Sequence, residues 1–213
     1  MQHSALLLSL AAAQVSVFVA LHTPVISDAT RRSLGWGATW RDTLRRATRL
    51  SLSSVEARPY TLLTYMLGHA DAMHLLCNTF TIMMLSPPVL TALRPARFLG
   101  LYAACGVAGG VSQLAVQYTK REYNTVTMGA SGALAGILLF HCVRVPHGEV
   151  AFLIFPMKNS TAGAAFIVLN AVGLAYQDPA GGGLAYASHL GGALAGAAIA
   201  PFFRGRAPPL RFR

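Results

Sequence analysis

The chain alternates between long apolar stretches and short polar segments. Six stretches contain no Asp, Glu, Lys or Arg: Ala5 to Ser27, Ala72 to Leu93, Phe98 to Thr119, Tyr123 to Val143, Asn159 to Gln177 and Pro179 to Phe203. A bilayer core about 30 Å thick needs about 20 apolar residues in each crossing helix, and only helices or closed barrels satisfy the backbone there. These stretches are too long for barrel strands, so the pattern predicts an all-α membrane protein with a bundle of six transmembrane helices.

Composition agrees with this fold class. The hydrophobic fraction is 54% and the charged fraction is 11%, against about 25% charged residues in an ordinary soluble domain. The net charge of +10 raises the alternative of nucleic-acid binding, but the basic residues cluster between apolar stretches, as in membrane proteins. We therefore expect the lipid bilayer, and no nucleic acid, as a partner. The three cysteines have no metal-ligand spacing, so we expect no metal and no cofactor.

The polar segments define the expected organisation. Residues 1–27 form a transmembrane helix, 28–64 an interfacial loop, 65–203 a core with helices two to six, and 204–213 a basic tail. The loop carries seven arginines together with Trp36 and Trp40, and these side chains favour the headgroup region; a solvated loop is the alternative. The first stretch has the alternative of a secretory signal peptide, although Met1 to Ser4 carries no basic side chain.

Polar residues lie in the first halves of helices two, four and six, which start from the same face of a six-helix bundle. They are His74, Asn78, Ser131 and His189. At 1.5 Å per residue, all lie within about 15 Å of that face. Polar groups inside a membrane are unfavourable and therefore indicate a functional site. Taken singly, each also fits a structural role, in helix packing or in hydrogen bonds between helices.

Small residues predict which helices meet. Helices four and six each carry a pair of glycines at the spacing that lets backbones approach closely. These pairs are Gly132 with Gly136, and Gly192 with Gly196. Because the two helices run parallel, their contact would place Ser131 beside His189, and a serine and a histidine within hydrogen-bond distance form an activated nucleophile.

The surroundings of the serine complete this hypothesis. Gly129 and Gly132 flank Ser131 closely enough to let another backbone approach its hydroxyl. His74, Asn78 and the backbone N–H of Ser131 are then the expected oxyanion donors. Every Asp and Glu lies in a loop or at a helix end, so the pattern favours a Ser-His dyad over a triad. Water must reach such a site, which predicts a polar cavity open to the face that carries loops one, three and five.

In order and helix placement, these residues resemble the rhomboid family of intramembrane serine proteases. The family has His-x-x-x-Asn on helix two, Gly-x-Ser-Gly at helix four, and a catalytic histidine followed by small residues on helix six. The matching residues are His74 and Asn78, then Gly129, Ser131 and Gly132, then His189, Gly191 and Gly192. The segment "LLTYMLGHADAMHLLCN" is also similar. The resemblance implies a six-helix core that cleaves single-pass membrane proteins, with the serine as nucleophile and the histidine of helix six as base.

The resemblance covers about residues 58–203 and has two departures. Many members have Trp-Arg just ahead of helix two, where this chain has Tyr60-Thr61. Many also have an aromatic residue one turn after the serine, stacked on the histidine, where this chain has Ala135. Neither departure removes a catalytic group.

Within the family the chain is most similar to the mitochondrial presenilin-associated type, through "GASGA", "HLGGALAG" and "VPHGEVAFLIFPM". This implies the mitochondrial inner membrane. Met1 to Ser27 is not an Arg-rich amphipathic presequence, so that location requires an upstream segment or an internal signal. The alternatives are a catalytically inactive rhomboid-like protein that binds or escorts membrane helices, and a small transporter. The pattern predicts no particular substrate, orientation or oligomeric state.

Overall fold

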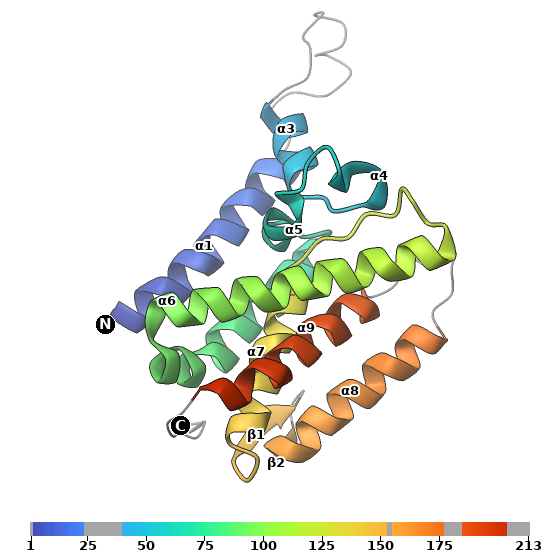
Figure 1. The fold of residues 1–213 in the computed structure, drawn as a ribbon. Helices are drawn as coiled ribbons and strands as arrows, with labels where there is room; N and C mark the ends of the chain where they lie inside the picture. Colours follow the sequence, from blue (N-terminus) through green and yellow to red (C-terminus); the bar gives the residue numbers. More distant parts are fainter. Residues whose placement is uncertain (1, 24–39, 153–154, 177–184, 204–213) are drawn as a thin grey trace, which may run out of the picture.

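The structure is a computed structural model that describes residues 2–23, 40–152, 155–176 and 185–203. It is mostly helical, with one two-stranded hairpin (Figure 1). The long helices are α1 (Gln2–His22), α6 (Ala72–Lys120), α7 (Ser131–Arg144), α8 (Asn159–Ala175) and α9 (Tyr186–Ile199). Each of the six apolar stretches contains helix. The basic tail at 204–213, and the parts of the stretches at 24–27, 177 and 179–184, lie outside the described residues.

Helix α6 consists of two helices that join at Arg94. The backbone turns sharply there, with φ 64 and ψ 162 at Arg94. Pro95 follows directly, and a proline disfavours the helical conformation in the residue before it. The two halves of α6 therefore correspond to the second and third apolar stretches, which the basic residues Arg94 and Arg97 separate in the sequence.

Not every apolar helix of the structure is long enough to cross a membrane. Within the described residues, Ser4–His22 and Ala72–Lys120 are long and apolar enough to cross a membrane, by length and composition. Helices α7 and α8 are shorter apolar helices, and α9 has 14 residues, fewer than the roughly 20 that a bilayer core needs. The predicted count of six spans is therefore not confirmed.

Helix α7 begins at Ser131, so only the second part of the fourth apolar stretch, Tyr123 to Val143, is helical. Residues 121–130 form a loop whose Thr127 pairs with Leu50 in an isolated antiparallel bridge. Gly129 has a φ of 119, a conformation that is incompatible with a right-handed helix. The stretch lacks charges, but β-branched residues and this glycine determine its backbone.

The expected interfacial loop contains several short helices. They are α3 (Trp40–Ala47), α4 (Leu52–Val55), α5 (Thr61–Thr64) and the 3-10 helix η1 (Tyr65–Leu67). They gather at one end of the bundle, above α6 in Figure 1. Trp40 is 60% exposed, whereas Trp36 lies outside the described residues. Placement of this segment at the membrane surface stays a prediction.

A hairpin precedes α8, where the sequence pattern predicted no strand. Strand β1 (Glu149–Phe152) pairs antiparallel with β2 (Phe155–Lys158), and Glu149 lies opposite Lys158. Pro156 cannot continue a helix, so the apolar residues around it adopt extended backbone. The charged residues at the open end of the hairpin mark its limits in the sequence.

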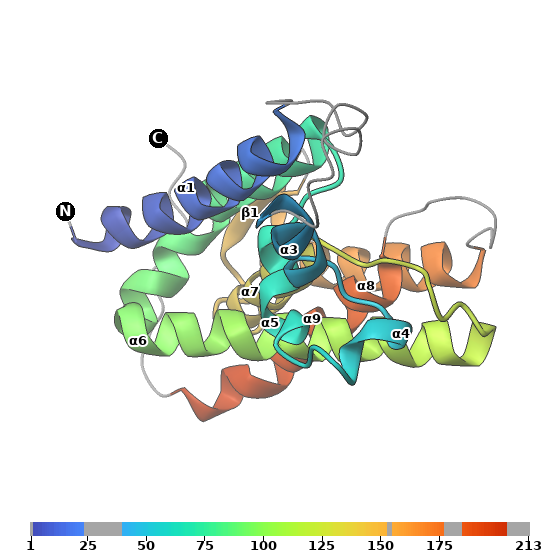
Figure 2. The ribbon, with the colours of Figure 1, turned by 90° about the horizontal axis from the view of Figure 1, so that it is seen from above.

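Helix α7 forms the centre of the bundle. It packs between α6 and α9, and almost all of its side chains are buried. Helix α8 packs on α7 and α9 at one side, while α1 lies along α6 at the other (Figures 1 and 2). The 3-10 helix η2 (Ala200–Phe202) follows α9 directly. The polar residues predicted to form a site lie on α6, α7 and α9, which meet in this core.

Candidate active site

Ser131 is the first residue of α7. The first hydrogen bond of the helix runs from the N–H of Leu134 to the carbonyl of Ala130, at 3.0 Å. The N–H groups of the first turn before Leu134 have no acceptor within the helix, and the helix dipole adds partial positive charge at this end. The serine hydroxyl therefore lies at a point where developing negative charge is stabilised.

Gly129 shapes the turn that leads to the serine. Its φ of 119 lies in a region that side-chain-bearing residues rarely adopt. Its N–H donates to the carbonyl of Tyr65 at 2.9 Å. A Cβ at this position would lie 2.6 Å from Nε2 of His74. Gly129 is thus required both by the backbone conformation and by the close approach of the His74 ring.

Ser131 and His189 meet in the core. Nε2 of His189 lies 2.8 Å from Oγ of Ser131, although 58 positions separate them in the chain. Both side chains are half-buried. The contact depends on helix α9 lying directly against α7, the arrangement that the glycine pairs predict.

The packing of α7 on α9 is backbone against backbone. A Cβ on Gly192 would overlap the carbonyl oxygen of Gly132, and a Cβ on Gly196 would overlap that of Gly136. Both predicted pairs therefore face each other across one interface. The hydroxyl of Ser188 also lies against Gly132, so this interface has no room for a side chain.

A third polar residue, Asn170 of α8, holds the histidine from its other side. Oδ1 of Asn170 lies 2.8 Å from Nδ1 of His189, while Nδ2 of Asn170 donates to the carbonyl of Phe166 at 2.8 Å. With the amide oriented in this way, Nδ1 of the histidine must donate a proton. Nε2 is then the acceptor for the serine hydroxyl.

The sequence did not single out Asn170. It lies within an otherwise apolar stretch, and an uncharged amide there is a weak signal. A carboxamide, that of Asn170, thus lies against the nitrogen of His189 that faces away from Ser131. An asparagine at mid-stretch on helix five was the signal available.

His74 and Asn78 lie beside the serine in different ways. Asn78 lines the same cavity as Ser131, and its Nδ2 donates to the carbonyl of His74 at 2.8 Å. One N–H of this amide remains available, and its Oδ1 is buried without a partner among the described residues. His74 packs against Gly129 and edge-on against His69, at 5.0 Å between ring centroids, and it is not among the residues that line the cavity.

His69 precedes α6 and is almost fully buried behind His74. Burial, together with positive charge on His74, lowers the pKa of His69 to about 4. The ring is therefore neutral at pH 7. Neither ring nitrogen has a hydrogen-bond partner among the described residues, which suits a packing role for His69 rather than proton transfer.

A cavity of about 170 Å³ opens beside the serine and the histidine. Its polar lining residues are Asn78, Thr81, Ser131 and His189, and the remainder are Cys77, Leu85, Leu134, Ala135, Leu138 and Phe166. The polar residues come from α6, α7 and α9. The cavity is thus less polar than expected, because leucines of α6 and α7 form much of its wall.

The missing aromatic residue at Ala135 has a counterpart on another helix. Phe166 of α8 lies with its ring centroid 6.3 Å from that of His189, at an interplanar angle of 43°. Ala135 leaves space that belongs to the cavity. The histidine therefore has an aromatic neighbour, although not from the position that the family resemblance suggests. Over the described residues, no group of three His, Cys, Asp or Glu could hold a metal ion.

Several known proteins are similar to this chain in sequence. The presenilin-associated rhomboid-like protein, mitochondrial, of Homo sapiens is 28% identical over 135 residues, which are 63% of this chain and 35% of that protein. The putative rhomboid protease YdcA of Bacillus subtilis (strain 168) is 35% identical over 98 residues, 46% of each chain. Rhomboid protein 1, mitochondrial, of Saccharomyces cerevisiae is 30% identical over 113 residues, 51% of this chain and 32% of that one.

The chain matches about a third of the length of the presenilin-associated relatives. The family model described as "Rhomboid domain" matches residues 56–206, a range that begins in the segment before α5 and continues past α9. It includes all the helices that contribute to the site. Because this match covers most of the sequence, the chain belongs to the rhomboid family.

Proposed function

We propose that this chain is an intramembrane serine endopeptidase that cleaves transmembrane segments of single-pass membrane proteins. The observation that carries the proposal is the 2.8 Å contact between Oγ of Ser131 and Nε2 of His189. A serine hydroxyl that donates to a histidine is poised for nucleophilic attack. Family membership and a relative described as a putative rhomboid protease support the same activity.

The proposed reaction begins when Ser131 attacks the peptide carbonyl. His189 accepts the hydroxyl proton on Nε2 and then donates it to the leaving amine. Asn170 keeps the histidine in the tautomer that can accept, through the hydrogen bond at Nδ1. After the amine leaves, water attacks the acyl carbonyl as Nε2 of His189 takes its proton, and the histidine returns that proton to Oγ of Ser131 as the bond from the acyl carbon to the serine breaks and the carboxylic acid departs.

The oxyanion needs donors on the side of the serine that faces the turn. The N–H of Ser131 at the start of α7 is one, and the available N–H of Asn78 is a second. His74 packs on Gly129, two residues before the serine, and we propose it as a further donor. The geometry supports Asn78 more directly than His74.

The substrate would lie in the cavity beside this site. The leucines and Phe166 that line it suit apolar side chains of a transmembrane segment. A peptide bond inside a helix is shielded by its own hydrogen bonds, so the substrate must unwind near the cut. We infer that small or helix-breaking residues mark the cleavage position.

Six spans and a mitochondrial location belong to the same proposal. The two halves of α6, together with α1, α7, α8 and α9, supply six helices, and the short ones would cross a bilayer that is locally thinned. The names of the human and yeast relatives support the mitochondrial inner membrane. In this arrangement residues 1–27 form the first span and 65–203 the catalytic core.

A fluorophosphonate probe that reacts with activated serines tests the mechanism. Purified wild-type protein in detergent should be labelled, and Ser131→Ala should not be. His189→Ala should lose most labelling because the hydroxyl is then not activated. Absence of labelling in a folded wild-type protein, or equal labelling of Ser131→Ala, would contradict the proposal and favour a rhomboid-like protein without catalysis.

A further inference from the structure

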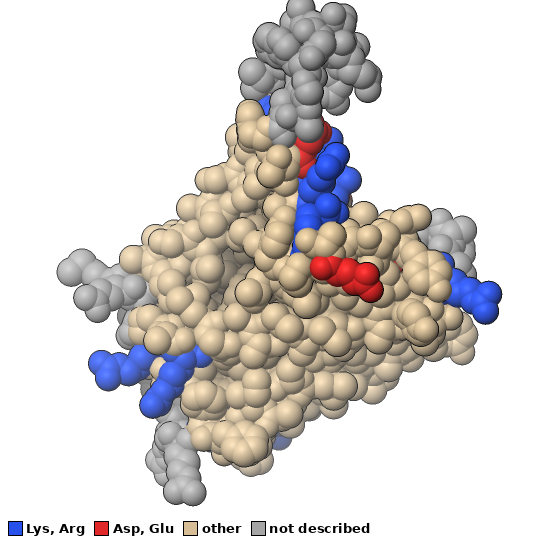
Figure 3. Space-filling view, turned by 45° about the horizontal axis from the view of Figure 1, so that its top comes forward, with Lys and Arg blue, Asp and Glu red and all other residues tan. Residues whose placement is uncertain are grey.

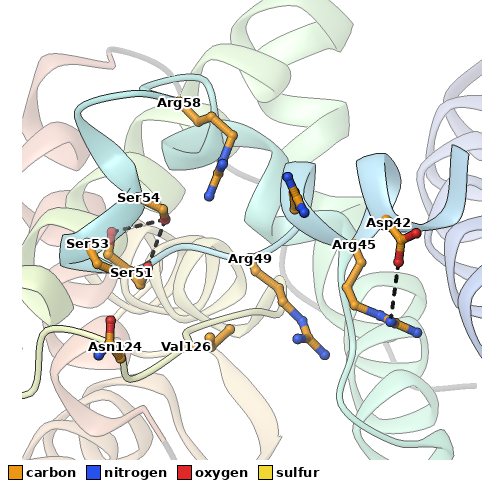
Figure 4. Close-up of a pocket in the computed structure, with 10 residues that line it drawn as sticks. Asp42, Arg45, Arg49, Ser51, Ser53, Ser54, Arg58, Asn124 and Val126 are labelled. Carbon is orange, nitrogen blue, oxygen red and sulfur yellow. Dashed lines mark hydrogen bonds and ion pairs between the residues drawn. The ribbon is translucent and has the colours of Figure 1, made fainter. Parts of the chain in front are cut away.

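A second cleft, of about 340 Å³, lies in the segment that joins α1 to α6. Its walls carry four arginines, Arg45, Arg46, Arg49 and Arg58, and the serines between positions 51 and 54 (Figure 4). Figure 3 shows one band of basic side chains at the end of the molecule where α3 lies, and other basic side chains at the left and right edges. None of the catalytic residues proposed above lines this cleft.

Positive charge in the cleft is only partly balanced. Asp42 is the one acidic side chain among the residues that line it in the described part of the chain. Its carboxylate lies 3.9 Å from Arg45, at the outer limit of an ion pair. Partial desolvation, and then the nearby charge of Arg45, lower the pKa of Arg49. An anion in the cleft would relieve this repulsion.

One buried hydrogen-bond donor in the cleft lacks a partner among the described residues, and a group of serine hydroxyls lies in the same cleft. Nε of Arg58 is buried and has no acceptor among the described residues. Ser51 and Ser54 are buried, with their hydroxyl oxygens 2.7 Å apart, and the hydroxyl of Ser53 lies 3.2 Å from that of Ser51. A buried donor without an acceptor is unfavourable, so an anion that enters the cleft would be stabilised by a hydrogen bond from Nε of Arg58, and the serine hydroxyls could rotate to donate to it.

We propose that this cleft binds a phosphate group, as the headgroup of an anionic phospholipid or as free phosphate. Guanidinium groups match phosphate oxygens in forked, charge-assisted hydrogen bonds. The headgroup source fits the neighbouring α3, where Trp40 is 60% exposed and Arg41 lies 5.3 Å over its ring. An exposed tryptophan beside arginines is typical of a membrane interface.

The cleft has a structural connection to the catalytic serine. Asn124 and Val126 line it from the loop that leads into α7. That loop is joined to the arginine segment by two backbone hydrogen bonds between Leu50 and Thr127, of 3.0 and 2.8 Å. A bound phosphate would therefore hold together the two segments that support the turn before Ser131.

The test measures the melting temperature of the full chain in a nonionic detergent, because a ligand that binds the folded state raises it. The probes are dihexanoyl phosphatidylglycerol, dihexanoyl phosphatidylcholine and sodium phosphate, at matched ionic strength. The variant is Arg45→Gln with Arg49→Gln and Arg58→Gln. The control removes three exposed basic side chains elsewhere, with Arg97→Gln, Lys120→Gln and Lys158→Gln.

Phosphatidylglycerol should raise the melting temperature of wild type and control. The cleft variant should need at least about tenfold more phosphatidylglycerol for the same rise, because it binds the headgroup more weakly. If phosphate acts in the same way, the free ion suffices; if it does not, the headgroup needs its lipid. Equal effects of phosphatidylcholine, no effect of either anion, or an unchanged response of the cleft variant would overturn the proposal. If the cleft variant does not fold, Arg49→Gln alone, which changes an exposed side chain, provides the same comparison.

Discussion

At the scale of single residues, the orientation of one imidazole determines whether the serine is activated. Oδ1 of Asn170 accepts from Nδ1 of His189, and Nδ2 of Asn170 donates to the carbonyl of Phe166. If the amide flipped, both hydrogen bonds would be lost. The ring nitrogen that faces Ser131 is therefore an acceptor, and it is the Asn170 amide that imposes this tautomer.

We expect Asn170→Ala to lower the rate of fluorophosphonate labelling of Ser131 by about tenfold or more, because the histidine loses its fixed tautomer. The measurement is the pseudo-first-order labelling rate, together with the melting temperature. Val172→Ala, on an exposed position of the same helix, is the control. A labelling rate for Asn170→Ala equal to that of wild type would exclude a positioning role.

Gly129→Ala should reduce both stability and labelling. The positive φ and the contact of 2.6 Å with Nε2 of His74 would destabilise the fold by about 1–3 kcal/mol and move the turn before the serine. Melting temperature and labelling rate measure the two effects.

The matched control is Gly100→Ala, at a helical position where an added Cβ meets nothing within 4 Å. It should stabilise α6 by roughly 0.5–1 kcal/mol and leave labelling unchanged. A Gly129→Ala protein as stable and reactive as this control would show that the turn tolerates a side chain.

Sequence reasoning reached those site residues that short motifs mark, and missed those that only packing brings in. Ser131 and His189 stand out because polar residues with flanking glycines are unusual in apolar stretches. Asn170 and Phe166 belong to no local sequence pattern. They contact His189 only because α8 packs against α9. The side-chain directions of His74 and Asn78 likewise depend on the turn at Gly129.

At the scale of elements, the contact between α7 and α9 brings Ser131 and His189 together. The glycine pairs predicted this contact because close backbone approach has a simple spacing rule. The start of α7 was not predictable from hydropathy, since residues 123–130 lack charges and yet form a loop that pairs with Leu50. The hairpin at 149–158 was missed for the same reason: an apolar stretch does not by itself distinguish helix from strand.

Gly196→Ala should separate α7 from α9, because its Cβ would overlap the backbone of Gly136. We expect a lower melting temperature and a loss of Ser131 labelling, since the serine and histidine lie on the two helices that move apart. Ala198→Leu adds a larger side chain to an exposed position of α9 and should change neither quantity. Retention of full labelling by Gly196→Ala would show that the interface can adjust.

At the scale of the whole molecule, the sharp turn at Arg94 decides how the chain is threaded through a membrane. If both halves of α6 cross, the turn at residues 94–97 and the segment before α6 lie on opposite sides. The first half of α6 carries Asn78 and the second half leads to the loop before Ser131. The active site would then open toward the side of the arginine cleft, and the turn would face the other side.

Cysteine accessibility checks this threading. In a Cys77→Ala background, the remaining Cys105 and Cys142 are buried. Labelling of a single new cysteine then shows on which side of the membrane that cysteine lies. In sealed vesicles of uniform orientation, an impermeant maleimide should label either Ser53→Cys or Arg97→Cys, and should label both after lysis. Equal labelling of the two before lysis would mean that α6 does not cross twice. That result would leave the Ser131–His189 contact intact but would leave fewer than six spans, and so contradict a membrane-embedded protease of six spans.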